Sequence, residues 1–376
     1  MSMVEIGGFA SPRFGAVKDV FAGHFEAGQE LGARFSLVLD GELAVDLWAG
    51  SADRAGKIPF DDRTLTQVFS TTKAVAALLI ARLVDQGRLA YGQRVAEVWP
   101  EFAQAGKAAI TIEQALSHQA GLCGLPGPFE PFEWFNWEGI VERLELMAPL
   151  WPPGTASGYH PVTFGFIAGE IFRRVDGRTM ARALAEDIAG PCGLDLRIGV
   201  GPEDRARTAD LRRPTAFPDF GEVTEAKRLA FLSPWSSPAG GAAGEARAAP
   251  IPSTNGYATA EALARLMGAL AGDGRLAGVD IVSPETIAEA ARQRISGPDL
   301  VLPYEISWGA GFMRNQGLDI WGPGQATFGH AGWGGSAAFA DPDRRLAGAY
   351  VMNRQDIHLI GDPRARRLIE AAYAGL

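Results

Sequence analysis

The sequence predicts an α/β protein of the α+β type, in which both ends of the chain share one antiparallel sheet flanked by helices. Two apolar, strand-like runs near the N-terminus, residues 34–39 and 43–48, are joined by Asp40-Gly41, a dipeptide typical of hairpin turns. Strand patterns return towards the C-terminus, at residues 308–314, 335–340 and 347–353.

The middle of the chain is helical and rich in loops, without clear strand pairs, and this contrast divides the protein into two lobes. We expect an α/β lobe made of residues 1–88 and 257–376, and an all-helical lobe of residues 89–256 inserted between its halves. At 376 residues, the chain has the length of two ordinary domains and can bury a large core. The cleft between the lobes is the expected place for an active site.

Helices are expected where apolar residues recur at helical spacing or fill an uninterrupted run. These segments are residues 16–28, the apolar run that follows Ser70 and ends at Val84, residues 164–172, and residues 362–373. The run after Ser70 is almost wholly apolar, which indicates a helix surrounded by protein on all sides. It would therefore hold the residues at its start rigidly.

The net charge of −9 arises from interspersed acidic and basic residues, so neither a nucleic acid nor a membrane surface is an expected partner. Residues 1–25 lack the charged start, apolar stretch and cleavage site of a signal peptide. No apolar segment is long enough to cross a bilayer. We expect a cytoplasmic protein that acts on a small molecule; the sequence leaves the oligomeric state open.

Cysteines and histidines give no sign of a cofactor. Cys123 and Cys192 are the two cysteines of the chain, and we expect free buried thiols. The five histidines are scattered without the spacing of metal ligands. No metal and no other cofactor is expected.

Ser70 and Lys73 place a hydroxyl and an amine three residues apart at the start of the apolar helix, so that both side chains share one helical face. A serine hydroxyl needs a neighbouring base to become a good nucleophile, and a lysine pressed against an apolar core can lose its proton readily enough to serve. The first turn also presents free N–H groups to any negative charge that forms near Ser70. The segment therefore indicates an activated nucleophile.

Two further segments contain residues that are candidates for a functional site. Tyr159 lies in a turn-rich stretch, residues 152–163, just before an apolar helix; it is either a projecting hydroxyl or an ordinary core tyrosine. Residues 328–336 contain four glycines around His330 and Trp333 and lead into a strand. Such a stretch either lets a ligand lie against the backbone or simply forms a tight hairpin.

Taken in order, these three segments resemble the serine β-lactamase and penicillin-binding-protein family, and within it the class C β-lactamase-like branch that includes the family VIII carboxylesterases. The resemblance extends from about residue 35 to residue 350. Residues 116–122 are similar to the family's Leu-x-x-His-x-x-Gly-Leu stretch, and Trp-Pro-Pro-Gly at 151–154 precedes the tyrosine as expected. The resemblance implies a β-lactamase-like fold and a serine hydrolase.

Carried over residue by residue, the resemblance implies a catalytic group of Ser70, Lys73 and Tyr159. Ser70 would be the nucleophile, Lys73 a base, and Tyr159 the residue that shuttles the proton. The backbone N–H groups of Ser70 and Trp333 would form the oxyanion hole, where two donors are worth several kcal/mol in the transition state. The resemblance leaves open whether Lys73 or Tyr159 takes the first proton.

His330, Ala331 and Gly332 match the Lys-Thr-Gly element of the family, and His330, Gly332 and Trp333 would line the substrate pocket. Two positions differ from the motifs of the family. Pro161 stands where the family's Tyr-x-Asn motif has an amide, and His330 replaces a lysine by an imidazole that is mostly neutral at pH 7. Without these anchors for an amide and a carboxylate, small neutral esters are favoured over β-lactams and D-alanyl peptides.

For two stretches of the helical lobe, the sequence allows either a functional or a purely structural interpretation. Aromatic residues crowd residues 129–137, and Phe129 and Trp134 are candidates either for an apolar wall of the substrate site or for a plug that holds the lobe together. Residues 233–253 are rich in Pro, Gly, Ala and Ser, and form either a cover for the site or a mobile loop.

We expect a serine carboxylesterase that hydrolyses short-chain esters through an acyl-enzyme on Ser70, with β-lactam hydrolysis at most a side activity. The alternatives are a class C-like β-lactamase or D-alanyl peptidase, and a silent member that only binds a ligand. A rival nucleophile is Ser336 in a lipase-like elbow, but alanine replaces the last glycine of that motif and a strand follows where the elbow requires a helix.

Overall fold

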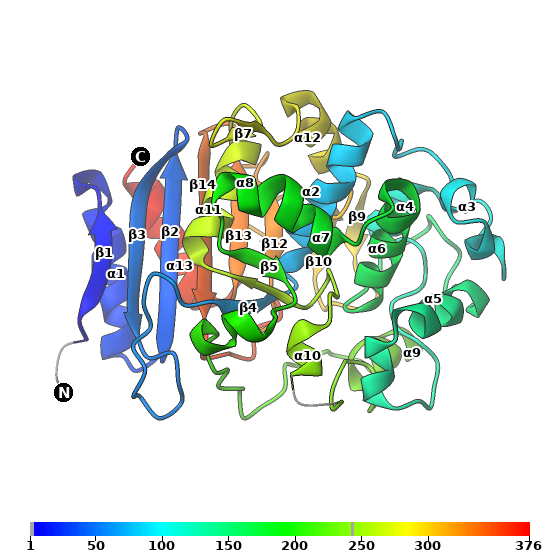
Figure 1. Ribbon diagram of the computed structural model, residues 1–376, viewed down its shortest axis with the longest axis horizontal. Helices are drawn as coiled ribbons and strands as arrows, with labels where there is room; N and C mark the ends of the chain where they lie inside the picture. The colour runs from blue at the N-terminus through cyan, green and yellow to red at the C-terminus, as the bar shows by residue number, and fades with distance from the viewer. Residues whose placement is uncertain (1–3, 242–243) are drawn as a thin grey trace.

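The protein is built around a mixed arrangement of helices and one large antiparallel sheet, seen in a computed structural model that describes residues 4–241 and 244–376 (Figure 1). Among these residues, nine strands form that sheet in the order β1-β3-β2-β14-β13-β12-β11-β10-β9. The strands are β1 Ile6–Ala10, β2 Gly32–Leu39, β3 Glu42–Gly50, β9 Ile295–Pro298, β10 Glu305–Trp308, β11 Met313–Arg314, β12 Phe328–Ala331, β13 Ala337–Asp341 and β14 Leu346–Met352.

Helices cover both faces of this sheet and form a further layer at one end of it. The helices are α1 Gly15–Glu26, α2 Thr72–Asp85, α3 Val95–Val98, α4 Ile112–Leu116, α5 Trp137–Leu146, α6 Thr163–Asp176, α7 Met180–Leu184, α8 Gly190–Cys192, α9 Glu225–Lys227, α10 Glu245–Ala248, α11 Ala260–Ala271, α12 Pro284–Ala291 and α13 Pro363–Ala374.

Alternate residues of the central strands divide the core into two parts. Phe339 on β13 packs with side chains of α1 and α13, which lie side by side on one face of the sheet. Its neighbours Ala338 and Ala340 point to the other face and pack against α11. Helix α11 approaches the sheet closely. A Cβ atom on Gly268 of α11 would lie 2.8 Å from the side chain of Val38 of β2, so glycine is needed at this contact.

Helix α2 is buried on all sides because it lies between the sheet and the helical lobe. It packs against α6, α7, α12 and strand β12, and nearly all of its side chains from Thr72 to Leu83 are buried. Full burial explains why the sequence is apolar right round this helix instead of along one stripe. The start of α2, where Ser70 lies, is thereby fixed against the core.

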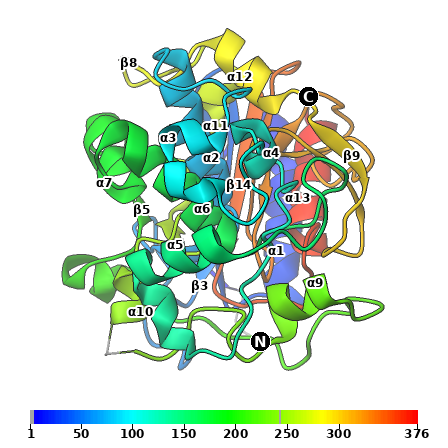
Figure 2. The ribbon, with the colours of Figure 1, turned by 90° about the vertical axis from the view of Figure 1, so that its right-hand side faces the viewer.

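The helices α3 to α6 form the layer furthest from α1 and α13 (Figures 1 and 2). In the described part of the chain, β4 Thr66–Phe69, β6 Gly256–Ala258 and β5 Leu196–Ile198 form a separate small sheet, and β7 Arg275–Leu276 pairs with β8 Val279–Asp280. Strand β5 lies inside the segment that the sequence indicated to be free of strand pairs, so that expectation was wrong at this point. The lobe boundaries at 88/89 and 256/257 stay a prediction.

The hairpin at Asp40-Gly41 is confirmed as β2 and β3, and the helices expected at 16–28, 164–172 and 362–373 are confirmed as α1, α6 and α13. The run 308–314 is not one strand but the end of β10, a turn, and β11. Strands β1 and β9 and helix α11 were not anticipated. Residues 233–253 include α10, while residues 242 and 243 of this loop lie outside the described residues.

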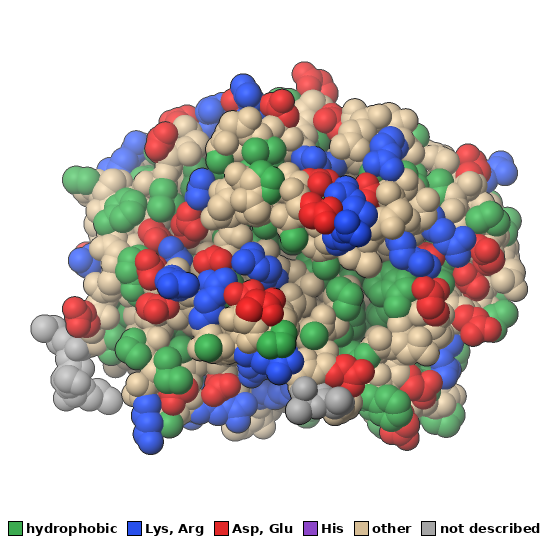
Figure 3. Space-filling model, viewed as in Figure 1, with side chains coloured by type: hydrophobic (Ala, Val, Ile, Leu, Met, Phe, Trp, Pro, Cys, Tyr) green, Lys and Arg blue, Asp and Glu red, His purple; other side chains and the backbone are tan. Residues whose placement is uncertain are grey.

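The surface and the thiols agree with the sequence analysis. On the face shown in Figure 3, acidic and basic side chains are interspersed. Cys123 and Cys192 are both free and buried. Within residues 4–241 and 244–376, no helix is both long and apolar enough to span a membrane.

Candidate active site

Ser70 lies in the turn between β4 and α2, where it is partly exposed. Phe69, just before it, has a backbone φ of +46°, in the left-handed region that residues with a side chain adopt rarely. This turn converts the direction of the strand into that of the helix within a few residues, and the N–H of Lys73 donates to the carbonyl of Ser70 at 2.9 Å. The hydroxyl of Ser70 therefore lies on the side of the helix start where Lys73 points.

The amine of Lys73 is completely buried and contacts three oxygen atoms. Its Nζ lies 3.0 Å from the Oγ of Ser70, 2.8 Å from the carbonyl oxygen of Pro161 and 3.0 Å from the carbonyl oxygen of Ser253. Burial holds the pKa of Lys73 well below its usual range, because removal of water penalises the ammonium form. A neutral amine that donates to both carbonyls directs its lone pair towards the hydroxyl of Ser70.

The ring of Tyr159 lies beside this pair. Its hydroxyl lies close to the side chain of Ser70, and the Nζ of Lys73 lies 4.8 Å from the ring centroid. Trp308 stacks on Tyr159 almost in parallel, with the ring centroids 5.8 Å apart. Burial raises the pKa of Tyr159, so the phenol keeps its proton at neutral pH.

The backbone of Tyr159 is held by side chains that sequence reasoning did not identify. The Oδ1 atom of Asp299 accepts hydrogen bonds from the N–H groups of Tyr159, Val301 and Leu302 at 2.9, 3.0 and 2.9 Å. The Nδ1 atom of His118 accepts one from the N–H of His160 at 3.1 Å. The Leu-x-x-His stretch was a signal for His118, but nothing in the local sequence connects Asp299 with a tyrosine 140 residues away.

The glycine-rich segment forms the turn between β12 and β13, next to Ser70. The hydroxyl of Ser336 donates to the carbonyl of Val68 at 2.8 Å and lies 3.0 Å from the hydroxyl of Thr71. A Cβ atom on Gly332 would lie 2.3 Å from the same carbonyl of Val68, so only glycine permits this approach. Ser336 is thus a buried tether between the end of the turn and the residues that flank Ser70, and the turn that carries Trp333 lies beside these residues.

His330 on β12 is almost fully buried near Tyr159, with ring centroids 6.0 Å apart. Its Nδ1 lies 2.7 Å from the carbonyl oxygen of Ala331. Burial, and then repulsion between the charged forms of His330 and Lys73, lower the pKa of His330 to about 3. The residue that replaces the family's lysine is therefore uncharged at neutral pH.

Phe129 and Trp134 lie in the core of the helical lobe. The indole N–H of Trp134 donates to the carbonyl of Trp235 at 2.7 Å, and its ring packs on Phe166 with centroids 5.6 Å apart. These contacts fit the plug that the sequence left open, and their role in substrate binding stays a prediction. The aromatic side chain that stacks on Tyr159 from this part of the chain is Phe231, at 6.4 Å between centroids.

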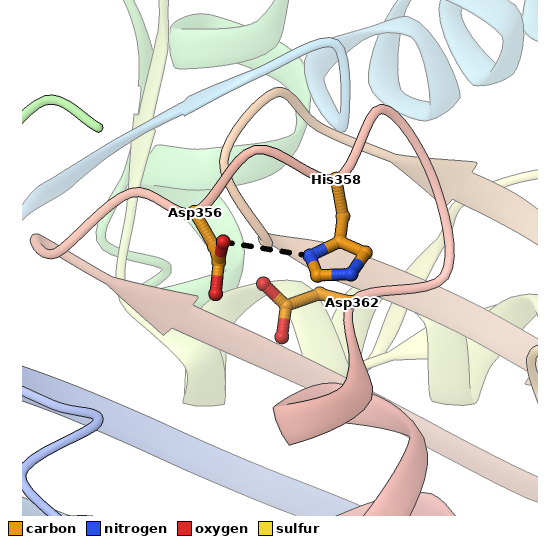
Figure 4. Close-up of side chains that lie close together, drawn as sticks. All are labelled: Asp356, His358 and Asp362. Carbon is orange, nitrogen blue, oxygen red and sulfur yellow. Dashed lines mark ion pairs between the residues drawn. The ribbon is translucent and has the colours of Figure 1, made fainter. Parts of the chain in front are cut away.

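A group with the spacing of metal ligands does exist among the described residues. The side chains of Asp356, His358 and Asp362 each place one ligand atom within 4.8 Å of the others (Figure 4). Both carboxylate oxygens of Asp362, however, accept hydrogen bonds from the guanidinium of Arg364. A cation would have to displace that partner, so we assign Asp362 to the ion pair.

The fold and the group around Ser70 define a serine hydrolase. The family model "Beta-lactamase" matches residues 17–373, and the chain belongs to this family. Its fold is β-lactamase-like, as the resemblance implied.

Known relatives agree with this assignment. The chain is similar to a penicillin-binding protein homolog from Caulobacter crescentus, with 62% identity, a TM-score of 0.97 and coverage of 99% of this chain and 100% of that one. It is similar to a family VIII carboxylesterase at 40% identity and a TM-score of 0.92, with the same coverage. It is also 37% identical to the esterase/beta-lactamase LipL of Mycobacterium tuberculosis, over 92% of this chain and 82% of the relative.

The buried histidines of the site predict a loss of stability in acid. Burial holds the pKa of both His160 and His330 at about 3, whereas an unfolded histidine titrates near 6.5. Their contribution to stability is therefore complete above pH 6.5 and is lost as the pH falls through 3. Each should add about 1.4 kcal/mol per pH unit to the slope of unfolding free energy against pH within this window.

Urea unfolding between pH 7 and 4 measures this slope, and NMR titration of the imidazole protons identifies the groups. In the His330→Asn variant, one titrating group is removed, so the slope of unfolding free energy against pH should be smaller by about 1.4 kcal/mol per pH unit. A site histidine that titrates near pH 6.5 in the folded protein would contradict the expectation.

Proposed function

We propose that this serine hydrolase is a carboxylesterase that cleaves short-chain carboxylic esters through an acyl-enzyme on Ser70. The observation that carries the proposal is the contact between the buried amine of Lys73 and the hydroxyl of Ser70, beside an uncharged His330. The family VIII carboxylesterase at 40% identity over nearly the whole chain supports it.

In the proposed acylation step, neutral Lys73 takes the proton of the Ser70 hydroxyl while Oγ attacks the ester carbonyl. The opposite directions of the two pKa shifts favour Lys73 over Tyr159 as first base, because the amine loses its proton more readily than usual and the phenol less readily. The negative charge that develops on the carbonyl oxygen is stabilised by the N–H groups of Ser70 and Trp333.

When the tetrahedral intermediate collapses, the bond to the alcohol breaks and Tyr159 gives its proton to the leaving oxygen. The ammonium of Lys73 replaces that proton, so the base is neutral again for the next step. A water molecule then attacks the acyl carbon, Tyr159 and Lys73 remove its proton, and Ser70 regains its hydrogen as the acid leaves. Proton transfers of this kind contribute roughly 10²- to 10⁴-fold each.

The proposed preference for esters over β-lactams as substrates depends on the residues at two positions. Pro161 offers no side-chain amide, and its carbonyl is already engaged by Lys73. His330 cannot pair with a substrate carboxylate as a fixed cation because it is neutral. A small ester needs neither anchor, since it requires only the nucleophile, the oxyanion donors and room for an apolar acyl group.

A β-lactamase or D-alanyl peptidase remains the second candidate. One relative is named a penicillin-binding protein homolog and another an esterase/beta-lactamase, and both match most of this chain. The same Ser70, Lys73 and Tyr159 would serve either reaction.

Replacement of the nucleophile or its base should abolish turnover. Ser70→Ala should remove ester hydrolysis because no second nucleophile is available for the covalent step. Lys73→Ala should lose roughly three or more orders of magnitude in kcat/KM, since members of a catalytic unit fail together. Circular dichroism shows whether each variant is folded, and a fluorophosphonate probe with mass spectrometry locates the labelled serine. Near-normal turnover by Ser70→Ala would refute the assignment, and labelling at Ser336 would move the nucleophile there.

Removal of the phenol should slow the chemistry more than it weakens binding. Tyr159→Phe keeps the stacking on Trp308 but loses the hydroxyl that contacts Ser70, so kcat should fall far more than KM rises. Steady-state kinetics with p-nitrophenyl acetate separate the two constants. An effect limited to KM would make Tyr159 a binding residue only.

Substrate preference distinguishes the two candidate functions. We expect kcat/KM for short-chain p-nitrophenyl esters to exceed that for nitrocefin by at least about a hundredfold, or ~2.7 kcal/mol in transition-state binding. His330→Lys should narrow this gap from the β-lactam side, mainly for substrates with a carboxylate. Comparable efficiency of the unmodified enzyme on penicillins and esters would favour a β-lactamase.

A further inference from the structure

The turn between β12 and β13 rests on a buried guanidinium. The NH2 group of Arg364, in the first turn of α13, donates to the carbonyl of Gly334 at 3.0 Å. The same carbonyl accepts the N–H of Asp356 at 3.0 Å, and the carbonyl of Trp333 accepts the side-chain amide of Gln355 at 3.4 Å. These bonds reach the turn from the start of α13 and from the segment between β14 and α13, which lie outside the group around Ser70.

Arg364 is itself held in one place. Its Nε and NH2 donate to the two carboxylate oxygens of Asp362, at 3.1 and 2.8 Å (Figure 4 shows Asp362 at the start of α13). Its NH1 donates to the carboxylate of Glu30 at 3.0 Å and to the carbonyl of Arg354 at 2.9 Å. With only 3% of its surface exposed, the guanidinium has little freedom to move away from Gly334.

The turn also lacks room to shift towards this ion pair. Gly335 has a backbone φ of +130°, and a Cβ atom on it would lie 2.5 Å from the Oδ2 of Asp362 and 2.8 Å from the NH2 of Arg364. On the other side, Gly332 lies against Val68, next to Ser70. The peptide of Trp333 is therefore fixed between the nucleophile's strand and the Arg364 ion pair.

From these contacts we propose that Arg364 is a positioning residue that aims the backbone N–H of Trp333 at the reacting carbonyl oxygen. The inference rests on the proposed ester hydrolysis and on the role of Trp333 in its oxyanion hole. A misplaced donor loses most of its effect on the transition state while substrate binding changes little, because the charge develops only during the reaction.

The test compares Arg364→Lys and Arg364→Gln with a matched control, Arg34→Lys. Arg34 is also a buried arginine, and its guanidinium contacts both carboxylate oxygens of Asp46 at 2.7 Å, but its partners are Asp46 and the carbonyl of Asp62, not the turn. Urea unfolding, kcat and KM for p-nitrophenyl acetate, and the affinity for an aryl boronic acid are measured for each. The boronic acid forms a tetrahedral, anionic adduct with serine and reports on the oxyanion hole directly.

Arg364→Lys and Arg364→Gln should lower kcat roughly tenfold or more, with KM within about twofold, and should weaken boronic acid binding by a similar factor. Arg34→Lys should lose stability without these losses. Equal kcat and boronic acid affinity in the Arg364 and Arg34 variants would overturn the inference and leave Arg364 a structural role.

If neither Arg364 variant folds, the same measurements are made on Gln355→Leu. This variant removes the hydrogen bond to the carbonyl of Trp333 without leaving a buried charge unpaired. A parallel fall of kcat and boronic acid affinity supports the positioning of the turn that carries Trp333, and unchanged values contradict it. Failure of the fluorophosphonate probe to label Ser70 in the unmodified protein would refute the proposed function itself. Labelling at Ser70 together with unaffected Arg364 variants would refute only the inference.

Discussion

The burial of one amine, that of Lys73, is the constraint on which the rest of the site depends. An isolated ammonium group costs several kcal/mol when it leaves water, so a buried lysine is tolerated only with partners or as the neutral amine. The fold supplies two carbonyls, from Pro161 and Ser253, which satisfy the N–H groups of that neutral form. The third contact is Ser70, and a structural requirement thereby places a neutral amine beside its hydroxyl.

The same low-dielectric surroundings set the protonation of the neighbouring groups. His118, His160 and His330 are neutral because burial and the nearby Lys73 disfavour their charged forms, and Tyr159 keeps its proton. A lysine at position 330 would place a positive charge in these surroundings. The uncharged side chain at that position is thus consistent with a site that binds a neutral substrate.

Both polar contacts and apolar packing hold the residues of the site in place. Asp299 and His118 hold the backbone around Tyr159, Ser336 ties β13 to Val68, and Arg364 contacts the turn that carries Trp333. The carboxylate of Asp299 and the guanidinium of Arg364 each have several hydrogen-bond partners, since an unpaired buried charge would destabilise the protein. The apolar helix α2 and the alanine-lined face of the sheet belong to the hydrophobic core of the protein.

Short-range features of the sequence determined the parts of the structure that depend on neighbours along the chain. The spacing of Ser70 and Lys73 brings their side chains together on one helical face, and Asp40-Gly41 specifies a hairpin because few residues adopt the backbone angles of its turn. Only the tertiary structure revealed Asp299 beside Tyr159, Ser253 beside Lys73 and Arg364 beside the glycine turn. Short strands such as β5 and β9 were missed for the same reason: their hydrogen-bond partners lie far away along the chain or in short strands, and a few residues carry too little periodicity to predict them. Local backbone preferences act over a few residues, whereas these contacts form only when the whole core closes.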